Sequence, residues 1–247
     1  MGAFFNIVFY QPIYNLSVFF IGIFPGHSFG MAVVATTILV KFLLYPLTKK
    51  AIITQLRMRE IEPQMKAIKE KHKNNKETLA RATMELYREA KLNPFAGIIA
   101  IIIQLPVIIA LYLIIYKAGL PEIKPDLLYS FVSTPVLVSM KFLIFDMGNK
   151  SWILAILAGV TQFVQAYLTM PTPPKRSPGS EPSFQEDFAR SMSLQMKYVL
   201  PIFIVFIGHS LSSAVALYFV VSNLFTIGQE LALRKHRGAG QVLSIKY

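Results

Sequence analysis

Long apolar segments separated by polar ones are the main pattern along this chain. A helix of about 20 apolar residues is long enough to cross the hydrocarbon core of a bilayer. The last apolar stretch, about 197–233, is too long for one such helix and is interrupted at 208–213 by Gly, His and Ser residues. It therefore predicts two helices joined by a tight turn. In all, the pattern predicts five spans, at 28–48, 94–116, 151–170, 195–211 and 213–232.

Two further apolar segments are predicted to lie at the membrane surface. Residues 127–145 contain Pro135 and Lys141, and counting them as a span would move the later loops to the wrong side of the membrane. Residues 3–24 are long enough to cross, but their Asn, Gln, Pro and aromatic residues are typical of an interfacial helix. No positively charged region precedes them, which argues against a signal peptide. We predict an outer-face amphipathic helix within 1–27, with a sixth span as the alternative.

The longest polar segment, 49–93, has the pattern of a helical hairpin. Apolar residues recur every three or four positions on both sides of Asn74 and Asn75, which is the spacing of a coiled-coil seam. Pro63 predicts a kink or a break in the first arm. Because a shorter loop would connect two spans, the hairpin is predicted to offer a partner surface, with a solvated linker as the alternative. The seam residues are Met58, Ile61, Met65 and Ile68, then Leu79, Thr83, Leu86 and Ala90.

The distribution of basic residues predicts the orientation, because cytoplasmic loops carry an excess of Lys and Arg. With the N-terminus outside, 20 of the 25 basic residues fall on the inner side, in 49–93, 171–197 and the tail from 229. The predicted fold is thus an all-α membrane protein with five transmembrane helices, N-out and C-in, in one bundle. Its remaining parts are the cytoplasmic hairpin at 49–93, an extracytoplasmic loop at 117–150, a cytoplasmic loop at 171–194 and a basic tail at 233–247.

Composition supports a membrane protein and excludes several kinds of site. Hydrophobic residues make up 54% of the chain and charged residues only 15%, well below the quarter or so usual in soluble domains. The absence of cysteine removes disulfides, thiolate metal sites and Cys nucleophiles. The four His residues lack ligand spacing and no phosphate-binding loop is present, so neither a metal nor a cofactor is expected.

Lys41 is the one charged residue within 28–48 and the strongest candidate for a functional residue. A charge at membrane depth is costly, so such a residue is normally kept where water, a partner or a substrate meets it. The alternative is a side chain that stretches to the cytoplasmic headgroups. Polar residues in other spans could line a wet cavity with Lys41 or only form interhelical hydrogen bonds. These residues are Thr36, Thr37, Gln104, Gln162, Gln165, Ser222 and Asn223.

Three motifs in order, with the hairpin between them, resemble the YidC/Oxa/Alb membrane insertases. They are 40–48 (VKFLLYPLT), 92–97 (LNPFAG) with 103–107 (IQLPV), and 200–203 (LPIF) with 217–229 (LYFVVSNLFTIGQ). The resemblance extends over about 4–235, and the lack of a large outer domain is similar to the short, five-span bacterial type. One difference is Lys41, because the family usually has arginine there. Lysine keeps the charge but lacks the planar fork of arginine.

The resemblance implies an insertase and chaperone of the bacterial cell (inner) membrane, acting without nucleotide hydrolysis. It implies a hydrophilic groove, open to lipid, with Lys41 at its centre, lined by Thr37, Gln104, Gln162, Gln165, Tyr218, Phe219, Ser222 and Asn223. Leu217 and Ile103 are further candidates for its apolar wall. The implied partners are nascent membrane proteins, lipids, the ribosome, the signal-recognition machinery and the Sec translocon, but not DNA. Partner or lipid contact is expected at Arg57, Arg59, Lys66, Lys69, Lys71, Lys73, Arg234, Lys235 and Arg237.

Other classes of protein fit less well. A transporter or channel could use Lys41 and the glutamines as an anion site, but the five spans show no repeated halves. An enzyme is not expected, because catalysis at depth needs carboxylates, His or an activated nucleophile. Lys41 is the only ionisable residue well inside a predicted span.

Overall fold

The computed structural model describes residues 2–72, 75–92, 96–116, 120–169, 191 and 193–244. Within these ranges, the side chains of Gln55, Arg59, Lys69, Lys76, 96–103 and 236–244 lie outside the described part. The described chain is mostly helical and divides into two compact units. Unit 1 consists of Met1–Tyr45, Ile101–Gln162 and Pro201–Thr226, and unit 2 of Pro46–Ala100, Phe163–Leu200 and Ile227–Tyr247.

Unit 1 contains the apolar helices that precede and follow the polar segment of the chain. Two of its helices, α7 and α8, agree with the predicted spans 94–116 and 151–170 to within two residues. The predicted turn within 208–213 lies between α10 and α11. The elements are α1 (Ala3–Phe5), π-helical η1 (Asn6–Tyr10), α2 (Gln11–Ile23), η2 (Pro25–His27), α3 (Phe29–Leu43), η3 (Pro125–Leu127), α10 (Leu200–Ser210), and parts of α7 (Ala96–Tyr116), α8 (Trp152–Thr169) and α11 (Ser213–Ser244).

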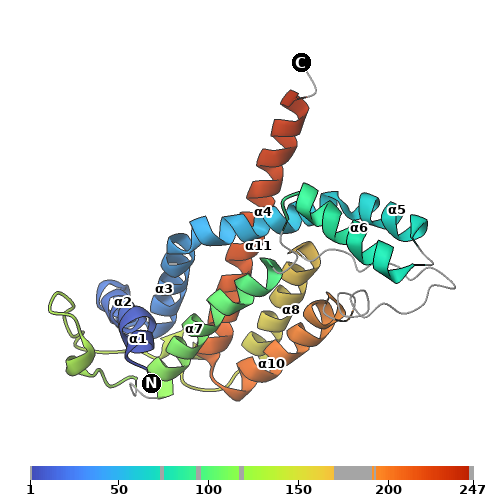
Figure 1. The fold of residues 1–247 in the computed structure, drawn as a ribbon. Coiled ribbons are helices and arrows are strands. Elements are labelled where there is room, and N and C mark those ends of the chain that lie inside the picture. Colours follow the sequence, from blue (N-terminus) through green and yellow to red (C-terminus); the bar gives the residue numbers. More distant parts are fainter. Residues whose placement is uncertain are drawn as a thin grey trace. The chain divides into compact units, whose positions relative to one another are not determined.

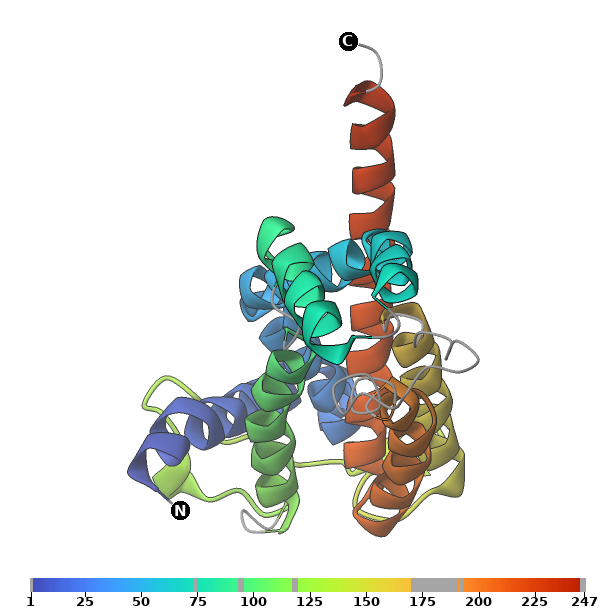
Figure 2. The ribbon, with the colours of Figure 1, turned by 45° about the vertical axis from the view of Figure 1, so that its right-hand side comes forward.

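Helices α2 and α3 lie side by side and form the first part of the core of unit 1 (Figures 1 and 2). Tyr14 and Val18 of α2 are fully buried, as are Phe29 and Val33 of α3. Ser28 begins α3 as its N-cap, because its Oγ accepts a hydrogen bond from an N–H in the first turn. The packing of α2 on α3 joins the apolar N-terminal segment to the helix that carries Lys41.

The loop between α7 and α8 is fastened to α2 by polar contacts. Asn15 Nδ2 donates to the carbonyl of Leu127 at 2.8 Å, and its Oδ1 accepts from the N–H of Tyr129 at 2.6 Å. The hydroxyl of Tyr14 accepts from the N–H of Lys124 at 2.9 Å. Since Asn15 is buried, these bonds satisfy groups that would otherwise be costly to bury.

The apolar segment 127–145 is not a helix beyond the single turn that ends at Leu127. It contains a short antiparallel hairpin of β1 (Lys141–Phe142) and β2 (Phe145–Asp146). An irregular backbone is unfavourable in lipid, where polar groups cannot bond to water. The position of this segment at the membrane surface stays a prediction.

The helix that carries Lys41 ends earlier than predicted. The range 28–48 is divided between α3 and α4 (Tyr45–Glu60), with the break at Leu44. Pro46 explains the break, because proline lacks an N–H and its ring clashes with the carbonyl four residues earlier. Lys41 is consequently in the last turn of α3.

Unit 2 contains the hairpin and end segments of the apolar helices α7, α8 and α11. Helices α5 and α6 lie side by side, and Met65 and Ile68 of α5 are half-buried while Leu86 of α6 is buried, as the seam pattern predicts (Figures 1 and 2). Pro63 is in the first turn of α5 and marks the predicted break, and Asn75 caps α6. The elements are α4, α5 (Glu62–Lys71), α6 (Lys76–Glu89), the start of α7, η4 (Gln195–Val199, a π-helix) and the ends of α8 and α11.

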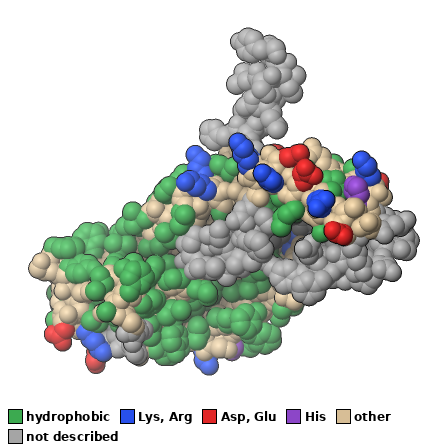
Figure 3. Space-filling view, in the orientation of Figure 1, with side chains coloured by type: hydrophobic (Ala, Val, Ile, Leu, Met, Phe, Trp, Pro, Cys, Tyr) green, Lys and Arg blue, Asp and Glu red, His purple; other side chains and the backbone are tan. Residues whose placement is uncertain are grey.

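Polar and apolar side chains have different positions on the surface. Figure 3 shows charged side chains gathered over α4–α6, whereas hydrophobic side chains cover most of the visible face of unit 1. A soluble protein would rarely expose so much contiguous apolar surface. The distribution is that of a protein whose apolar helices lie in lipid and whose hairpin lies in water.

Three described helical segments are long and apolar enough to cross a membrane: Ala3–Ile23, Trp152–Thr169 and Ser213–Lys235. Helices α3 and α4 meet the same criterion together and would add a fourth span if they form one. The apolar segment Gln104–Tyr116 of α7 is shorter. Because Ala3–Ile23 is the segment predicted to lie on the surface, the count of five spans and the N-out, C-in orientation stay predictions.

Candidate functional site

Lys41 contacts side chains from two other helices of unit 1. Its Nζ donates to Oε1 of Gln104 on α7 at 3.3 Å and to Oγ1 of Thr226 on α11 at 3.2 Å. The side chain therefore bonds to side chains of two other apolar helices, and its role in function stays a prediction. Its partners come from chain segments 63 and 185 residues away.

Gln104 connects Lys41 to further polar groups on α11. Its Nε2 donates to the hydroxyl of Tyr218 and to Oγ of Ser222, the latter at 3.1 Å. Thr226 in turn donates its hydroxyl proton to the carbonyl of Ser222 at 2.9 Å. Tyr218, Ser222 and Thr226 are spaced by four residues and so lie on one face of α11. We call Lys41, Gln104, Tyr218, Ser222 and Thr226 the lysine cluster.

The charge of Lys41 is not balanced by a carboxylate among the described side chains. Its two partners are a neutral amide and a neutral hydroxyl, which solvate the ammonium without cancelling its charge. An ammonium has three N–H donors, and two are used here. The cluster is thus able to attract an anionic group and to offer it a hydrogen bond.

Other residues predicted for the site form hydrogen bonds outside the lysine cluster. The hydroxyl of Thr37 donates to the carbonyl of Val33 at 2.6 Å within its own helix. Thr36 contacts Ser17 of α2 at 3.5 Å. Asn223 donates to Oγ1 of Thr161 on α8 at 3.2 Å. These contacts are interhelical or local hydrogen bonds, which the sequence offered as the alternative to a wet cavity.

The apolar candidates and the glutamines of α8 have varied positions. Phe219 and Leu217 are buried in unit 1, and the ring of Phe219 lies edge-on to that of Tyr218. Gln162 and Gln165 are half-buried on α8. The side chain of Ile103 lies outside the described residues.

Sequence reasoning missed Thr226, the second partner of Lys41. A signal was available, because Thr226 is four residues after Ser222 and eight after Tyr218, both already assigned to the site. It was passed over because its predicted position lies near the inner end of the last span, where a polar residue needs no special explanation.

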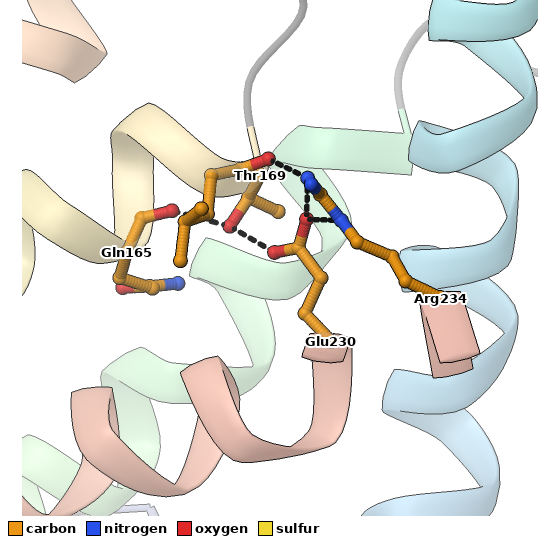
Figure 4. A network of polar contacts seen from close by, with 5 residues as sticks. Gln165, Thr169, Glu230 and Arg234 are labelled. Carbon is orange, nitrogen blue, oxygen red and sulfur yellow. Dashed lines mark hydrogen bonds and ion pairs between the residues drawn. The ribbon is translucent and has the colours of Figure 1, made fainter. Parts of the chain in front are cut away.

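A second polar network was also missed, and it lies in unit 2 (Figure 4). Glu230 is only 1% exposed, and its Oε1 pairs with Nη2 of Arg234 at 2.5 Å. Its Oε2 accepts from the hydroxyl of Thr169 at 2.9 Å, and Arg234 also donates to the carbonyl of Leu168 at 2.5 Å. Arg234 thus satisfies a backbone carbonyl at the C-terminal end of α8, which no residue within that helix can satisfy. Arg234 remains one-third exposed, so its predicted contact with a partner or lipid stays a prediction.

The other basic residues predicted to contact partners or lipid are mostly exposed. Arg57, Lys71 and Lys235 are exposed, and Lys66 pairs with Glu62 at 3.3 Å on the surface of α5. Lys73 and the side chains of Arg59, Lys69 and Arg237 lie outside the described residues. A surface ion pair such as that of Lys66 and Glu62 contributes little to stability, so it costs little to break. Lys66 can therefore contact a partner, as can the exposed basic residues named above.

Comparison with known proteins identifies the family. Residues 20–239 match the family described as 60Kd inner membrane protein. The chain is 32% identical over 237 residues to the membrane protein insertase YidC of Oceanobacillus iheyensis, covering 93% of this chain and 83% of that protein. It is 30% identical to the YidC insertase of Clostridium tetani (85% and 84% covered) and 28% identical to the insertase MisCA of Bacillus subtilis (90% and 77%).

Proposed function

This chain belongs to the 60Kd inner membrane protein family, with the YidC insertases, and from that premise we propose that it inserts nascent proteins into the bacterial cell membrane. The resemblance noted in the sequence is confirmed by these relatives, and the protein is a multi-pass membrane protein. The observation in the structure that carries the proposal is the lysine cluster. In it, Lys41 lies among neutral polar groups of two other apolar helices and has no carboxylate partner among the described side chains.

The cluster would form the polar part of a groove that is open to lipid and to the cytoplasm. Lys41, Gln104 and Thr226 are each half-buried, and we propose that their polar atoms meet water or a substrate there. A polar side chain in lipid is costly unless it is paired or hydrated. Water at this position would lower the cost of bringing the polar tail of a substrate into the membrane.

Lys41 would act on the substrate by electrostatic attraction. Two opposite unit charges about 4 Å apart attract each other by about 1 kcal/mol in bulk water and by about 4 kcal/mol at the effective dielectric constant near a protein surface. An acidic residue in the tail of a nascent protein would gain energy of this order beside the ammonium. The neutral partners Gln104 and Thr226 would keep that attraction intact, whereas a carboxylate partner would cancel it.

The apolar part of the substrate would then drive the step to completion. Once the tail has crossed, the following helix partitions into lipid with a gain of about 0.8 kcal/mol for each CH₂ removed from water. We propose that this gain makes nucleotide hydrolysis unnecessary. Exposed apolar side chains on α10, such as Phe203 and Phe206, would offer the emerging helix a surface as it leaves.

The contacts of α2 favour an interfacial position for the N-terminal segment. Asn15 lies near the middle of Ala3–Ile23 and is bonded to the loop that carries Lys124 and Asp126. If Ala3–Ile23 crossed the bilayer, this irregular loop and its charges would lie near the midplane. Each such charge would cost about 2.5–3.5 kcal/mol or more. We therefore retain the proposal of five spans with the N-terminus outside.

The proposed substrates are membrane proteins during synthesis, and the proposed further partners are the ribosome, the signal-recognition machinery and the Sec translocon. The charged surface of α4–α6 supports a contact of the hairpin with such a partner (Figure 3). Its mixed charge favours a protein surface over a nucleic acid alone. For the tail, anionic lipid is the simpler partner, since each basic residue near the inner leaflet gains about 1 kcal/mol.

Thiol labelling of single-cysteine variants tests the groove, because the chain has no cysteine of its own. Cysteine replaces Lys41, Gln104 or Thr226 in turn, and a membrane-impermeant thiol reagent is added from either side of the membrane. We expect labelling from the cytoplasm only. Leu224, which is 54% exposed on the same helix as Thr226, serves as the lipid-facing control and should stay unlabelled. Phe219 and Thr37 are buried controls.

Each result has a clear meaning for the proposal. Access from the cytoplasm alone supports a half-open wet groove and the insertase mechanism. Access from both sides would favour a channel or an alternating-access transporter. If neither side gives labelling at the three positions, the lysine cluster is a buried structural network and the groove mechanism is wrong.

A further inference from the structure

The turn of the β1–β2 hairpin presents two large apolar side chains to the surroundings. Leu143 and Ile144 connect the strands and are 82% and 85% exposed. A second exposed group lies just before the hairpin, where Val136 is fully exposed and Leu137 is 63% exposed. Exposed residues of this size in a turn are unfavourable in water, where turns normally contain Gly, Asn, Asp or Ser.

Leu143 is also in a backbone conformation that does not suit leucine. Its φ is 53°, in the left-handed region. The first position of a two-residue hairpin turn with positive φ is normally glycine or asparagine. Leucine is therefore unfavourable here both for the backbone and for solvation. Because leucine is present at this position despite both costs, we infer that its apolar side chain has a role of its own.

The base of the hairpin is held rigidly at the start of α3. The hydroxyl of Ser28 donates to the carbonyl of Lys141, and the N–H of Phe29 donates to the carbonyl of Ser139, each at 2.8 Å. Phe142 packs so closely on Gly30 that a Cβ at residue 30 would be 2.2 Å from the Cβ of Phe142. The tip therefore projects from a fixed base.

The same base is joined to the start of α11. The N–H of Ser213 donates to the carbonyl of Asn149 at 2.7 Å, and the N–H of Ala214 donates to that of Met147 at 3.2 Å. Met147 is fully buried. The hairpin thus belongs to the end of unit 1 where the apolar helices α3 and α11 begin.

We propose that the β1–β2 hairpin is a lipid anchor whose tip, Leu143 and Ile144, enters the acyl chains of the outer leaflet. Lys141 and Asp146 face each other across its base, at the level of the headgroups. The tip is two residues beyond the base on each strand, and a strand rises about 3.3 Å per residue. The tip therefore lies about 7 Å deeper than the charged base. That is within the depth of about 5–10 Å to which interfacial segments are buried. The aromatic rings of Phe142 and Phe145 lie between the charged base and the tip.

The chemistry of the hairpin favours lipid over a protein partner. A protein-binding surface usually combines apolar anchors with polar groups that give direction and specificity. Here the polar residues are confined to the base, and the tip is wholly aliphatic. Contact with lipid does not depend on the insertase function, but the choice of the outer leaflet rests on the proposed orientation.

Spin labelling in lipid vesicles tests the anchor. Single cysteines at Ile144 and at Val136 are labelled with a nitroxide, and its accessibility to oxygen and to a water-soluble nickel complex is measured. Oxygen concentrates in lipid and the nickel complex in water, so their ratio reports depth. Ile153, exposed on α8, is the lipid-facing control, and Glu122 is the exposed polar control in the same loop.

We expect Ile144 to give a ratio several-fold above that of Glu122 and close to that of Ile153. A ratio equal to that of Glu122 places the tip in water and overturns the proposal. Protection from both reagents means that protein covers the tip, in this or a second molecule, and it also overturns the proposal. Thiol labelling of Glu122→Cys from each side identifies the leaflet. Labelling from the cytoplasm would contradict the orientation while leaving lipid contact intact.

Discussion

The ammonium of Lys41 and the hydroxyl of Thr226 are 3.2 Å apart, although 185 residues separate them in the chain. This contact joins the end of α3 to α11, and Gln104 of α7 completes the connection. An uncharged residue that was not selected for the site thus helps to position the charge on which the proposed function depends. Its contribution can be measured without altering the lysine.

Thr226→Val removes the acceptor of Lys41 while keeping the shape of the side chain. A hydrogen bond to a charged group contributes about 1.5–3 kcal/mol, and we expect about 1–2 kcal/mol here because Lys41 is only half-buried. Thermal unfolding in detergent should show a midpoint lower by about 2–8 °C. Thr226→Ser, which keeps the hydroxyl, is the matched control. Identical midpoints for the Val and Ser variants would mean that the contact is not made.

Lys41→Ala removes the proposed attraction for acidic tails. We expect insertion of a substrate with an acidic tail to fall about tenfold, which corresponds to about 1.4 kcal/mol. Lys41→Arg should preserve insertion, because the charge remains. The measurement is protection of the translocated tail from protease in vesicles, with a neutral-tailed substrate for comparison. Equal activity of all three proteins on the acidic substrate would remove electrostatic capture from the mechanism.

Arg234→Ala should destabilise the protein by leaving the carboxylate of Glu230 buried without its partner. Breaking a buried pair costs about 3–5 kcal/mol, and we expect about 2–4 kcal/mol because Arg234 is one-third exposed. The free energy of unfolding in detergent is the quantity to measure. Lys235→Ala, next in the chain and exposed, should leave it unchanged. A double variant, Glu230→Gln with Arg234→Ala, should recover part of the loss, whereas no recovery would argue against the pair.

Deletion of residues 55–90 removes most of the hairpin and tests whether insertion requires it. Helices α5 and α6 pack on each other, so their removal should leave the apolar helices folded. We expect the truncated protein to enter the membrane normally but to insert substrates poorly. Circular dichroism and protease resistance would verify its fold before insertion is measured. Normal insertion would reduce the hairpin to a linker.

Leu143→Gly should stabilise the protein in detergent. A left-handed conformation costs about 1–2 kcal/mol for an L-residue and nothing for glycine. The added flexibility of glycine offsets part of this gain, so we expect a midpoint higher by about 1–4 °C. Ile144→Gly, at the neighbouring position of the turn, is the control. A clear loss of stability at 143 would show that Leu143 packs against the protein and is not held out for lipid.

The apolar pattern predicted the elements well where one rule decided them. Helices α7 and α8, the turn before Ser213 and the break at Pro63 follow from hydrophobic length, turn residues and the chemistry of proline. The break at Leu44 was missed, although Pro46 provides the same signal, because the apolar run continues through it. The length of the apolar run 28–48 favoured one continuous helix, and this outweighed the helix-breaking effect of Pro46.

The candidate site was predicted only in part, because side-chain partners depend on how each helix is rotated about its axis. Lys41 and Gln104 were both chosen, yet nothing in the sequence tells that they meet while Thr37 bonds to its own backbone. Glu230 was set aside as lying at the end of a span. Its burial depends on Thr169 and Arg234, which a single sequence does not connect with it.

The close packing of Phe142 on Gly30 has a consequence for the response of the protein to its membrane. With no room between them, the hairpin and the first turn of α3 move together. A thicker or thinner bilayer therefore cannot be accommodated by sliding the loop along the helix, and the whole of unit 1 must tilt or the lipid around it must deform. We therefore expect the activity of the protein to depend on the thickness of the bilayer, and Gly30 to be the residue that sets this dependence.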